Sequence, residues 1–431
     1  MAQTTIPVGS ALSRKIYGAA LFARIIEAPS FTKTLTGAAP NQGSAESKLK
    51  GQTAATMPIV RVTDLTKTNG DTVSVDLFDT INGKPLVGDR AAEGTGEKLT
   101  TSSMDIRIDL LTKAVDAGKK MANQRTIHNL RGVAMAQLEG YFPRLYDQMA
   151  IVHMAGARGS MTGRDWVVPT GGDADFADIL MNTVMAPTYN RHFVVDTATT
   201  GALVQGGLQL NSVGNTDIMD LNHIDTLSLI LDDLEYPLPP VKIADDPAAN
   251  DEPIKAILWV TPRQWHHLQT TGGTSNVWRT FLQNAWVRKS YGSKHPLFSG
   301  EPGLWNGILV KKLPRFTVRF ESGETGVKYV AVGDRYTATE SSVTVGSISG
   351  YAVERAILTG GQALAMVYGR NNSNGGTFSW LERKYDFDRG LEVAADAMFG
   401  MSKLRFNFTD GSGNSEPTDY GVMAVDSVVK L

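Results

Sequence analysis

Two segments of the chain alternate apolar and polar residues with a period of two. In "DTVSVDLF", residues 71–78, Val73, Val75 and Leu77 alternate with polar residues, and "MDIRIDLL", residues 104–111, repeats the pattern. Such a period is that of a β-strand with one apolar and one wet face. Hairpin turns usually take about two to five residues, whereas roughly 25 separate these segments. The polar connection, which contains "GDRAAEGTGEKL" at 88–99, therefore predicts a long hairpin that projects from the body.

A long helix is predicted from about residue 126. Its signature is a stripe of apolar residues spaced by threes and fours, which runs from Leu138 to Val152. Pro143 falls inside this stripe, where a proline removes a backbone hydrogen bond and clashes with the preceding turn. We therefore expect a kink or a break at Pro143. Residues 158–215 follow as a segment rich in glycine and turn formers.

Residues 222–345 are predicted to form one mixed α/β unit. A helix over 222–235, with Asn222 as its N-cap, precedes a strand at 254–260. The strand leads into a second helix, in which Thr261 caps, Pro262 takes the first helical position and Gln264 completes a capping box. A further helix is predicted at 276–289, and strands at 307–313, 317–321 and 327–333.

The last section is predicted to contain strands and one short helix. Glycines punctuate "ILTGGQALAMVYG", residues 357–369, which is the helix candidate. Residues 384–408 are interpreted as two strands joined at a glycine-containing bend, and residues 421–429 as a final strand. The chain shows no internal repeat of solenoid period.

Composition narrows the class of protein. Of 431 residues, 42% are apolar and the net charge is −2, so a sizeable core is expected and a dedicated reader of nucleic-acid sequence is not. The absence of cysteine excludes disulfides and thiolate sites. No secretory signal and no apolar run of about 20 residues is present, which favours a protein made and used in cytoplasm, without membrane contact. In the first 50 residues six basic side chains face only two acidic ones, and part of the stretch is low in complexity, which is typical of a solvated tail or of an arm that binds a partner or faces nucleic acid.

Catalytic and metal-binding motifs are not found in the sequence. The seven histidines form no spacing that would place two ligands on one helical face, and the adjacent pair His266 and His267 point apart by about 100° on a helix. "GSISG" carries Ile348 where a nucleophile elbow needs serine. No cofactor, metal or catalytic residue is therefore predicted. Two alternatives stay open. One is a hydrolase with a site in the cleft between the α/β lobe and the rest of the chain, and the other is a smaller assembly protein, such as a decoration or tail protein.

Three segments resemble the major capsid proteins of tailed bacteriophages with the Hong Kong 97-like fold, and more narrowly the N-four-like podophage branch. "DTVSVDLFDTINGKPLVGDRAAEGTGEKLTTSSMDIRIDLLTKAVDAG" is similar to the extended loop of that family. "MAPTYNR" resembles a short segment after its long helix, and "YDFDRGLEVAADAMFGMSKLRFN" its closing strand pair. Pro143 within the long helix departs from the family pattern.

The resemblance implies an α+β chain divided into an N-terminal arm, an extended β-hairpin loop, a peripheral domain with the long helix, and an axial α/β domain. The boundaries that we expect are 1–66 for the arm, 67–117 for the loop, 118–221 and 355–431 for the peripheral domain, and 222–354 for the axial domain. It also implies hexamers and pentamers in an icosahedral shell around double-stranded DNA, assembled in the host bacterial cytoplasm. Portal and possibly scaffolding or decoration proteins would be partners, and DNA contact would be non-specific.

The hairpin is the expected contact with the next subunit. The hypothesis is that the apolar face of residues 71–115 lies on that neighbour and that five charged residues of the connection select its register: Asp89, Arg90, Glu93, Glu97 and Lys98. Exposed ion pairs contribute only about 0.2–1 kcal/mol each, so apolar burial would hold the shell together. Some relatives crosslink subunits through a loop lysine. Lys84 and Lys98 qualify by position only, no asparagine partner is identifiable, and a crosslink is not predicted.

Overall fold

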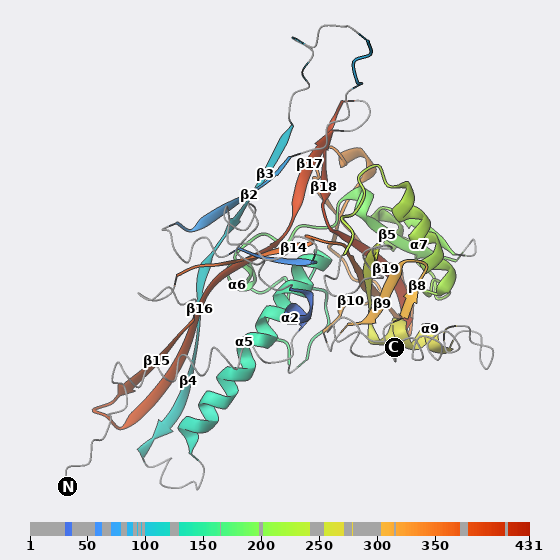
Figure 1. Ribbon diagram of the computed structural model, residues 1–431. Helices are drawn as coiled ribbons and strands as arrows, with labels where there is room; N and C mark the ends of the chain where they lie inside the picture. Colours follow the sequence, from blue (N-terminus) through green and yellow to red (C-terminus); the bar gives the residue numbers. More distant parts are fainter. Residues whose placement is uncertain are drawn as a thin grey trace, which may run out of the picture.

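The computed structural model describes residues 31–36, 57–62, 70–78, 84–88, 93, 96, 100–120, 129–163, 165–197, 201–241, 254–270, 278, 303–313, 316–370, 378–409 and 413–431. Figure 1 shows two bodies of structure, an elongated limb built around one long helix and a rounder α/β lobe beside it. A two-stranded ribbon extends from the region between them, away from both.

The limb contains a five-stranded sheet. Its long central strand is antiparallel to each of its three direct neighbours, and only the edge strand β1 pairs in parallel. The order is β1 (Ile59–Val62), β14 (Leu364–Tyr368), β16 (Gly390–Lys403) and β15 (Phe378–Tyr385), with β4 (Asp109–Lys119) paired to β16.

Helix α5 (Leu130–Ala155) packs on β16 and β4 of this sheet. It begins after Asn129, whose side chain accepts a hydrogen bond from the Gly132 N–H, and it continues through Pro143 without interruption. The expected break is therefore wrong. Phe142 and Leu145, on either side of the proline, are both buried, so packing holds the helix together where one backbone hydrogen bond cannot form.

Helix α5 ends at Gly156, which adopts φ 66°. A Cβ there would come within 2.4 Å of the Met185 carbonyl oxygen. Only glycine satisfies both the left-handed conformation and this close approach. The end of the helix is thereby placed against the start of the "MAPTYNR" segment.

The lobe is built on an eight-stranded mixed sheet. Its order is β6 (Ala202–Gln205), β5 (His192–Asp196), β19 (Val422–Lys430), β13 (Tyr351–Thr359), β7 (Ala256–Val260), β9 (Ile308–Lys312) and β8 (Gly303–Trp305), with β10 (Val318–Phe320) paired to β13. Strands from 192–205, 351–359 and 422–430 thus share this sheet with strands of 222–345. Sheet membership does not follow the segment boundaries expected from the sequence.

Two helices of the lobe illustrate how local signals set element ends. Helix α9 (Pro262–Thr270) begins with the predicted capping box, since the Gln264 N–H donates to Thr261 Oγ1 at 3.2 Å and the Thr261 N–H to Gln264 Oε1 at 2.8 Å. Helix α7 (Leu221–Asp233) is capped by Asp220 rather than by Asn222. In that capping box the Asp220 N–H donates to His223 Nδ1, so a histidine takes the position that a glutamate or glutamine usually occupies.

The segment 357–369 was predicted to be helical and is two strands instead. It forms the end of β13 and all of β14, joined at Gly360 and Gly361. Both strands are buried almost throughout, so the period of two that marks a half-buried strand is missing from their sequence. The strand predicted at 421–429 is confirmed as β19. Residues 384–408 do contain two strands, β16 and β17 (Arg405–Thr409), but these meet at Leu404, and the expected glycine-containing bend between them is wrong because Gly400 lies inside β16.

Smaller elements complete the fold. Part of the expected arm is core, because Phe31 and Leu35 of α2 (Phe31–Leu35) are buried and Phe31 contacts Trp259 edge to face. The helix predicted at 276–289 lies outside the described residues except for Trp278. The remaining elements are β2 (Thr72–Phe78), β3 (Thr101–Arg107), β11 (Val327–Val330), β12 (Glu340–Val343), β18 (Ser415–Asp419), α6 (Phe176–Leu180), η2 (Tyr189–Arg191), η3 (Gly207–Asn211) and η6 (Val332–Asp334).

Candidate assembly surface and the ion network beneath it

The predicted hairpin is confirmed as β2 and β3, paired antiparallel from Thr72 opposite Arg107 to Phe78 opposite Thr101. The second predicted strand does not continue to residue 111 in this hairpin, because it is divided at Ile108 and β4 pairs with β16 instead.

The apolar face of the hairpin is partly covered by the same chain. Val75, Leu77 and Met104 are partly buried and pack against a cluster that includes Phe406 and Phe408, and β3 contacts β17. That this face lies on the next subunit stays a prediction.

The connection of the hairpin is where apolar side chains are exposed. Phe78 is 64% exposed, Leu86 44% and Val87 72%. Of the five charged residues proposed for register, Glu93 is described and exposed, while Asp89, Arg90, Glu97 and Lys98 lie outside the described residues. Lys84 is also exposed. In Figure 1 β3 runs upward beside the β17–β18 hairpin, toward the connection.

A second exposed apolar point lies at the turn between β15 and β16, at the far end of the limb (Figure 1). Phe387 is 97% exposed there. Asp386, Phe387 and Asp388 all have positive φ, between 51° and 64°, which is unfavourable for residues other than glycine. An ion pair of 2.9 Å between Lys119 Nζ and Asp386 Oδ2 ties the turn to β4.

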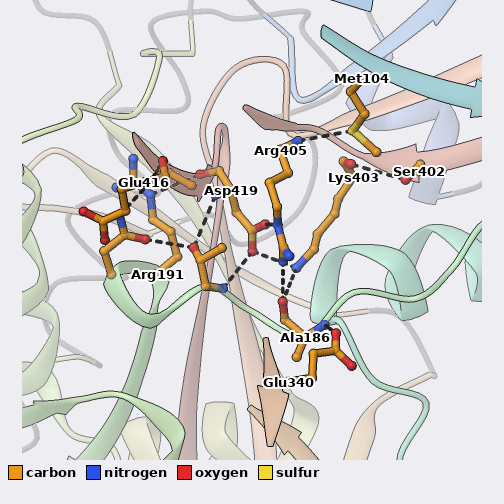
Figure 2. A network of polar contacts seen from close by, with 12 residues as sticks. Met104, Ala186, Arg191, Glu340, Ser402, Lys403, Arg405, Glu416 and Asp419 are labelled. Atoms are coloured by element: carbon orange, nitrogen blue, oxygen red, sulfur yellow. Dashed lines mark hydrogen bonds and ion pairs between the residues drawn. The ribbon is translucent and has the colours of Figure 1, made fainter. Parts of the chain in front are cut away.

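Beneath the hairpin base lies a buried network of charges around Asp419 of β18 (Figure 2). Its carboxylate accepts from Lys403 Nζ at 2.7 Å and from Arg405 Nε at 2.8 Å. The side chains of Asp419 and Lys403 have no exposed surface. Burial raises the pKa of Asp419, but the positive charges of Arg405 and Lys403 outweigh it and lower that pKa overall. Burial lowers the pKa of Lys403 to about 8 despite the attraction of Asp419.

The "MAPTYNR" segment, residues 185–191, is tied to this network by several hydrogen bonds. The Ala186 carbonyl accepts from Lys403 and Arg405, at 3.2 and 2.5 Å. The Thr188 N–H donates to Asp419 Oδ2 at 3.2 Å, and Arg191 Nε donates to the Asp419 carbonyl at 3.1 Å. The segment therefore joins the end of α5 to the β17–β18 hairpin. The sequence indicates this segment only through its resemblance to a family, because the residues that hold it lie more than 200 positions away.

A second buried cluster joins the lobe sheet to the long helix. Arg355 Nε and Nη2 donate to the two Asp426 carboxylate oxygens, each at 2.7 Å, and Nη1 donates to the Ala155 carbonyl at 2.8 Å. His192 Nε2 lies 2.7 Å from Asp426 Oδ2. Burial and the neighbouring Arg355 lower the pKa of His192, so the imidazole stays neutral beside the ion pair. Such bidentate geometry is what lets a buried pair offset its own desolvation.

Because of His153, near the end of α5, we expect the stability of the fold to decrease in acid. The side chain is buried, and burial lowers its pKa to about 4 from the usual 6.5. The unfolded chain then binds a proton that the folded chain excludes, so the free energy of unfolding should fall as the pH drops from about 6.5 to about 4, by roughly 3 kcal/mol for this group. Urea unfolding across that range measures the slope. His153→Gln, which cannot titrate, should be less steep than the unaltered chain, and an equal slope would contradict this role.

The hydrolase alternative finds no assembled site among the described residues. His266 is exposed on α9, and His267 Nε2 accepts from the Lys430 N–H at 3.5 Å. Nowhere in the described ranges do three or more histidine, aspartate or glutamate side chains gather as metal ligands would. Among the described helices, none has both the length and the hydropathy to cross a bilayer.

Exposed apolar side chains at two separate points, Val87 and Phe387, are typical of a protein that makes contacts through its surface. Comparison with known proteins identifies the kind. Residues 5–431 match the family model described as phage capsid protein, and the chain belongs to this family. It is the major capsid protein of a phage. The family consists of structural proteins and is not a class of enzyme. Nothing in the comparisons supports the alternative of a hydrolase.

Individual relatives are distant. The chain is similar to the major capsid protein of Pseudomonas phage KPP25, with 22% identity over 378 residues, 86% of this chain and 88% of the relative. Its fold is similar to the capsid of Ralstonia phage GP4, with a TM-score of 0.69 and 22% identity over 100% of this chain and 96% of the other. The capsid of cyanophage Pam1 follows, with a TM-score of 0.55 and 18% identity over 86% and 88%.

Proposed function

We propose that copies of this chain assemble as hexamers and pentamers into the icosahedral shell of a tailed phage, around its double-stranded DNA. The observation that carries the proposal is the family match over residues 5–431. A shell subunit needs contacts that repeat from copy to copy, and the exposed Val87 and Phe387 at two separate ends of the molecule fit that need. The shell would form in the bacterial host, with portal and possibly scaffolding or decoration proteins as partners.

The fold subtype that we propose is the Hong Kong 97-like one, in its N-four-like podophage branch. In this assignment α5 and the five-stranded sheet form the peripheral domain, the eight-stranded sheet with α7 and α9 forms the axial domain, and β2 with β3 forms the base of the extended loop. The long helix beside a sheet, and a hairpin that extends beyond both, support the assignment.

The hairpin connection, residues 79–100, is the proposed inter-subunit contact, together with the apolar face of residues 71–115. Leu86 and Val87 would bury apolar surface on a neighbour, at roughly 25 cal/mol per Å². The charged residues Asp89, Arg90, Glu93, Glu97 and Lys98 would select its register. Contact with packaged DNA would be independent of sequence, because the net charge of −2 offers no concentrated basic surface.

Expression of the chain by itself tests the function. Negative-stain electron microscopy of the purified protein is expected to show closed shells or regular capsomers of uniform size, because the contacts repeat from copy to copy. Light scattering across a range of salt concentrations follows the same association in solution. A monomer under every ionic condition would contradict the proposal.

A further inference from the structure

One stretch of the chain belongs to two different sheets. Strand β3 ends at Arg107 and pairs with β2, whereas β4 begins at Asp109 and pairs with β16. Ile108 alone separates the two strands; its side chain is buried, and its N–H donates to the Asp71 carbonyl at 2.8 Å. The direction in which the hairpin leaves the limb is therefore set by the backbone around Arg107 and Ile108.

This backbone lies directly on the limb sheet. A Cβ at Gly400 of β16 would come within 2.0 Å of the Arg107 carbonyl oxygen and 3.1 Å of Ile108 Cα, so a larger residue would push the strand away. On the apolar side of the hairpin, the Asn407 N–H of β17 donates to Ser102 Oγ at 2.9 Å. Both contacts press on a face of the ribbon, so they mainly resist its tilting out of its own plane.

Asn182 holds the edge of the ribbon. Its Oδ1 accepts from the Arg107 N–H at 2.9 Å, and its Nδ2 donates to the Arg107 carbonyl at 2.9 Å. The same Nδ2 donates to the Met401 carbonyl of β16 at 3.2 Å. The side-chain amide thus pairs with both backbone groups of one residue, as a neighbouring strand would, and joins them to the limb sheet. Because these backbone groups point within the plane of the ribbon, the bonds resist a swing in that plane.

A strained turn presents the Asn182 side chain. The preceding Met181 has φ 61° and ψ −46°, and the Asn182 N–H donates to the Leu180 carbonyl at 2.6 Å. This is the γ-turn with positive φ, which is rare and costly for a residue other than glycine. Met181 follows α6 and packs against the main core cluster. Such strain persists only where the surrounding structure holds the turn in place, so the body of the protein fixes the position of Asn182.

We propose that Asn182 is a positioning residue for assembly, which fixes the angle between the β2–β3 hairpin and the limb. The inference rests on the proposed shell function. A closed shell of one size needs every copy to present its contacts in the same direction, because a repeated contact closes only at a fixed rotation between copies. Asn182 acts through the backbone of Arg107. Without its amide the hairpin keeps its own pairing but takes a range of directions.

Distances between spin labels measure this angle, since the chain has no cysteine of its own. One label is placed at Thr101→Cys, at the exposed end of β3, and the other at Leu381→Cys on β15. A second pair, Leu381→Cys with Val133→Cys on α5, stays within the limb. Labelled chain is mixed with an excess of unlabelled chain, so that pulsed electron paramagnetic resonance reports distances within one copy, whether or not shells have formed.

Asn182→Ala is expected to broaden the distance distribution of the hairpin pair and to leave that of the limb pair unchanged. Asn182→Asp keeps the size of the side chain but cannot donate to the Arg107 and Met401 carbonyls, so it should broaden the same distribution. The matched control is Asn190→Ala. The Asn190 amide is also half-buried and makes two hydrogen bonds of 2.8 Å, to Thr418 and Thr188, but it binds β18 and not the hairpin, so both distributions should stay narrow.

An unchanged hairpin distribution in the two Asn182 variants, or one that broadens as much in Asn190→Ala, overturns the inference. Electron microscopy then tests the consequence for assembly: Asn182→Ala should give particles of mixed size and Asn190→Ala uniform shells. Uniform shells from Asn182→Ala would overturn its role in assembly. An unaltered chain that forms no shells overturns the proposed function, while the label distances still decide whether Asn182 fixes the hairpin.

Discussion

A chain that lacks residues 83–98 is expected to fold and stay soluble but to form no shells. The deletion leaves residues 79–82, 99 and 100 to connect Phe78 with Thr101, a length close to ordinary hairpin loops. The base of the hairpin should persist, because Val75 and Met104 pack against a cluster of their own chain that includes Phe406. What is lost is the exposed part, including Leu86 and Val87. Negative-stain microscopy and sedimentation measure assembly.

The control for this deletion is the stability of the variant itself. Its circular dichroism and thermal midpoint should match those of the full chain, because no buried residue is removed from the described part. A milder variant, Leu86→Ser with Val87→Ser, keeps the loop length and should weaken assembly by removing apolar contact alone. Normal shells from the deletion variant would show that the loop is not a required contact.

Asp419→Asn is expected to lower the free energy of unfolding by about 3–5 kcal/mol, because it leaves buried cations without their counter-charge. Lys403 has no exposed side-chain surface and Arg405 only 11%, and both donate to the carboxylate that the variant neutralises. The same carboxylate accepts the Thr188 N–H, so the variant should also loosen residues 185–191. Urea unfolding followed by tryptophan fluorescence measures the loss.

Asp232→Asn is the matched control. Asp232 also pairs with a lysine, at 2.6 Å from Lys255 Nζ, but its side chain is 57% exposed. Solvent screening limits such a pair to about 0.2–1 kcal/mol. If the two variants lost similar stability, the buried network would not be what joins the segments around Asp419.

Local signals predicted the elements that depend on neighbouring residues. The signal for the capping box of Thr261 and Gln264 lies within four residues, and the signal for the hairpin lies in the alternation of its own two strands. Because these signals are local, the predictions of the capping box and of the β2–β3 pair were confirmed. The N-cap of α7 was misplaced by two residues because His223 replaces the usual glutamate. The break at Pro143 was wrong because burial on both sides of the proline outweighs its local cost.

Fully buried strands were harder to predict. Residues 357–369 have no apolar alternation, since the strands β13 and β14 are covered on both faces. The segment was interpreted as a short helix punctuated by glycines, whereas Gly360 and Gly361 lie between two strands that belong to different sheets. No window of a few residues contains the information that decides between these outcomes.

The sequence by itself determined the projecting hairpin, the long helix, the absence of thiol chemistry and the class of protein, because periodicity, composition and family likeness are properties of the chain order. Only the tertiary structure decided that the apolar face of the hairpin is partly covered by its own chain, and that residues 185–191 are held by Asp419. Both depend on contacts between residues hundreds of positions apart. The interaction between such distant charges is strong only where they are buried away from water, and they become buried only when the chain has folded.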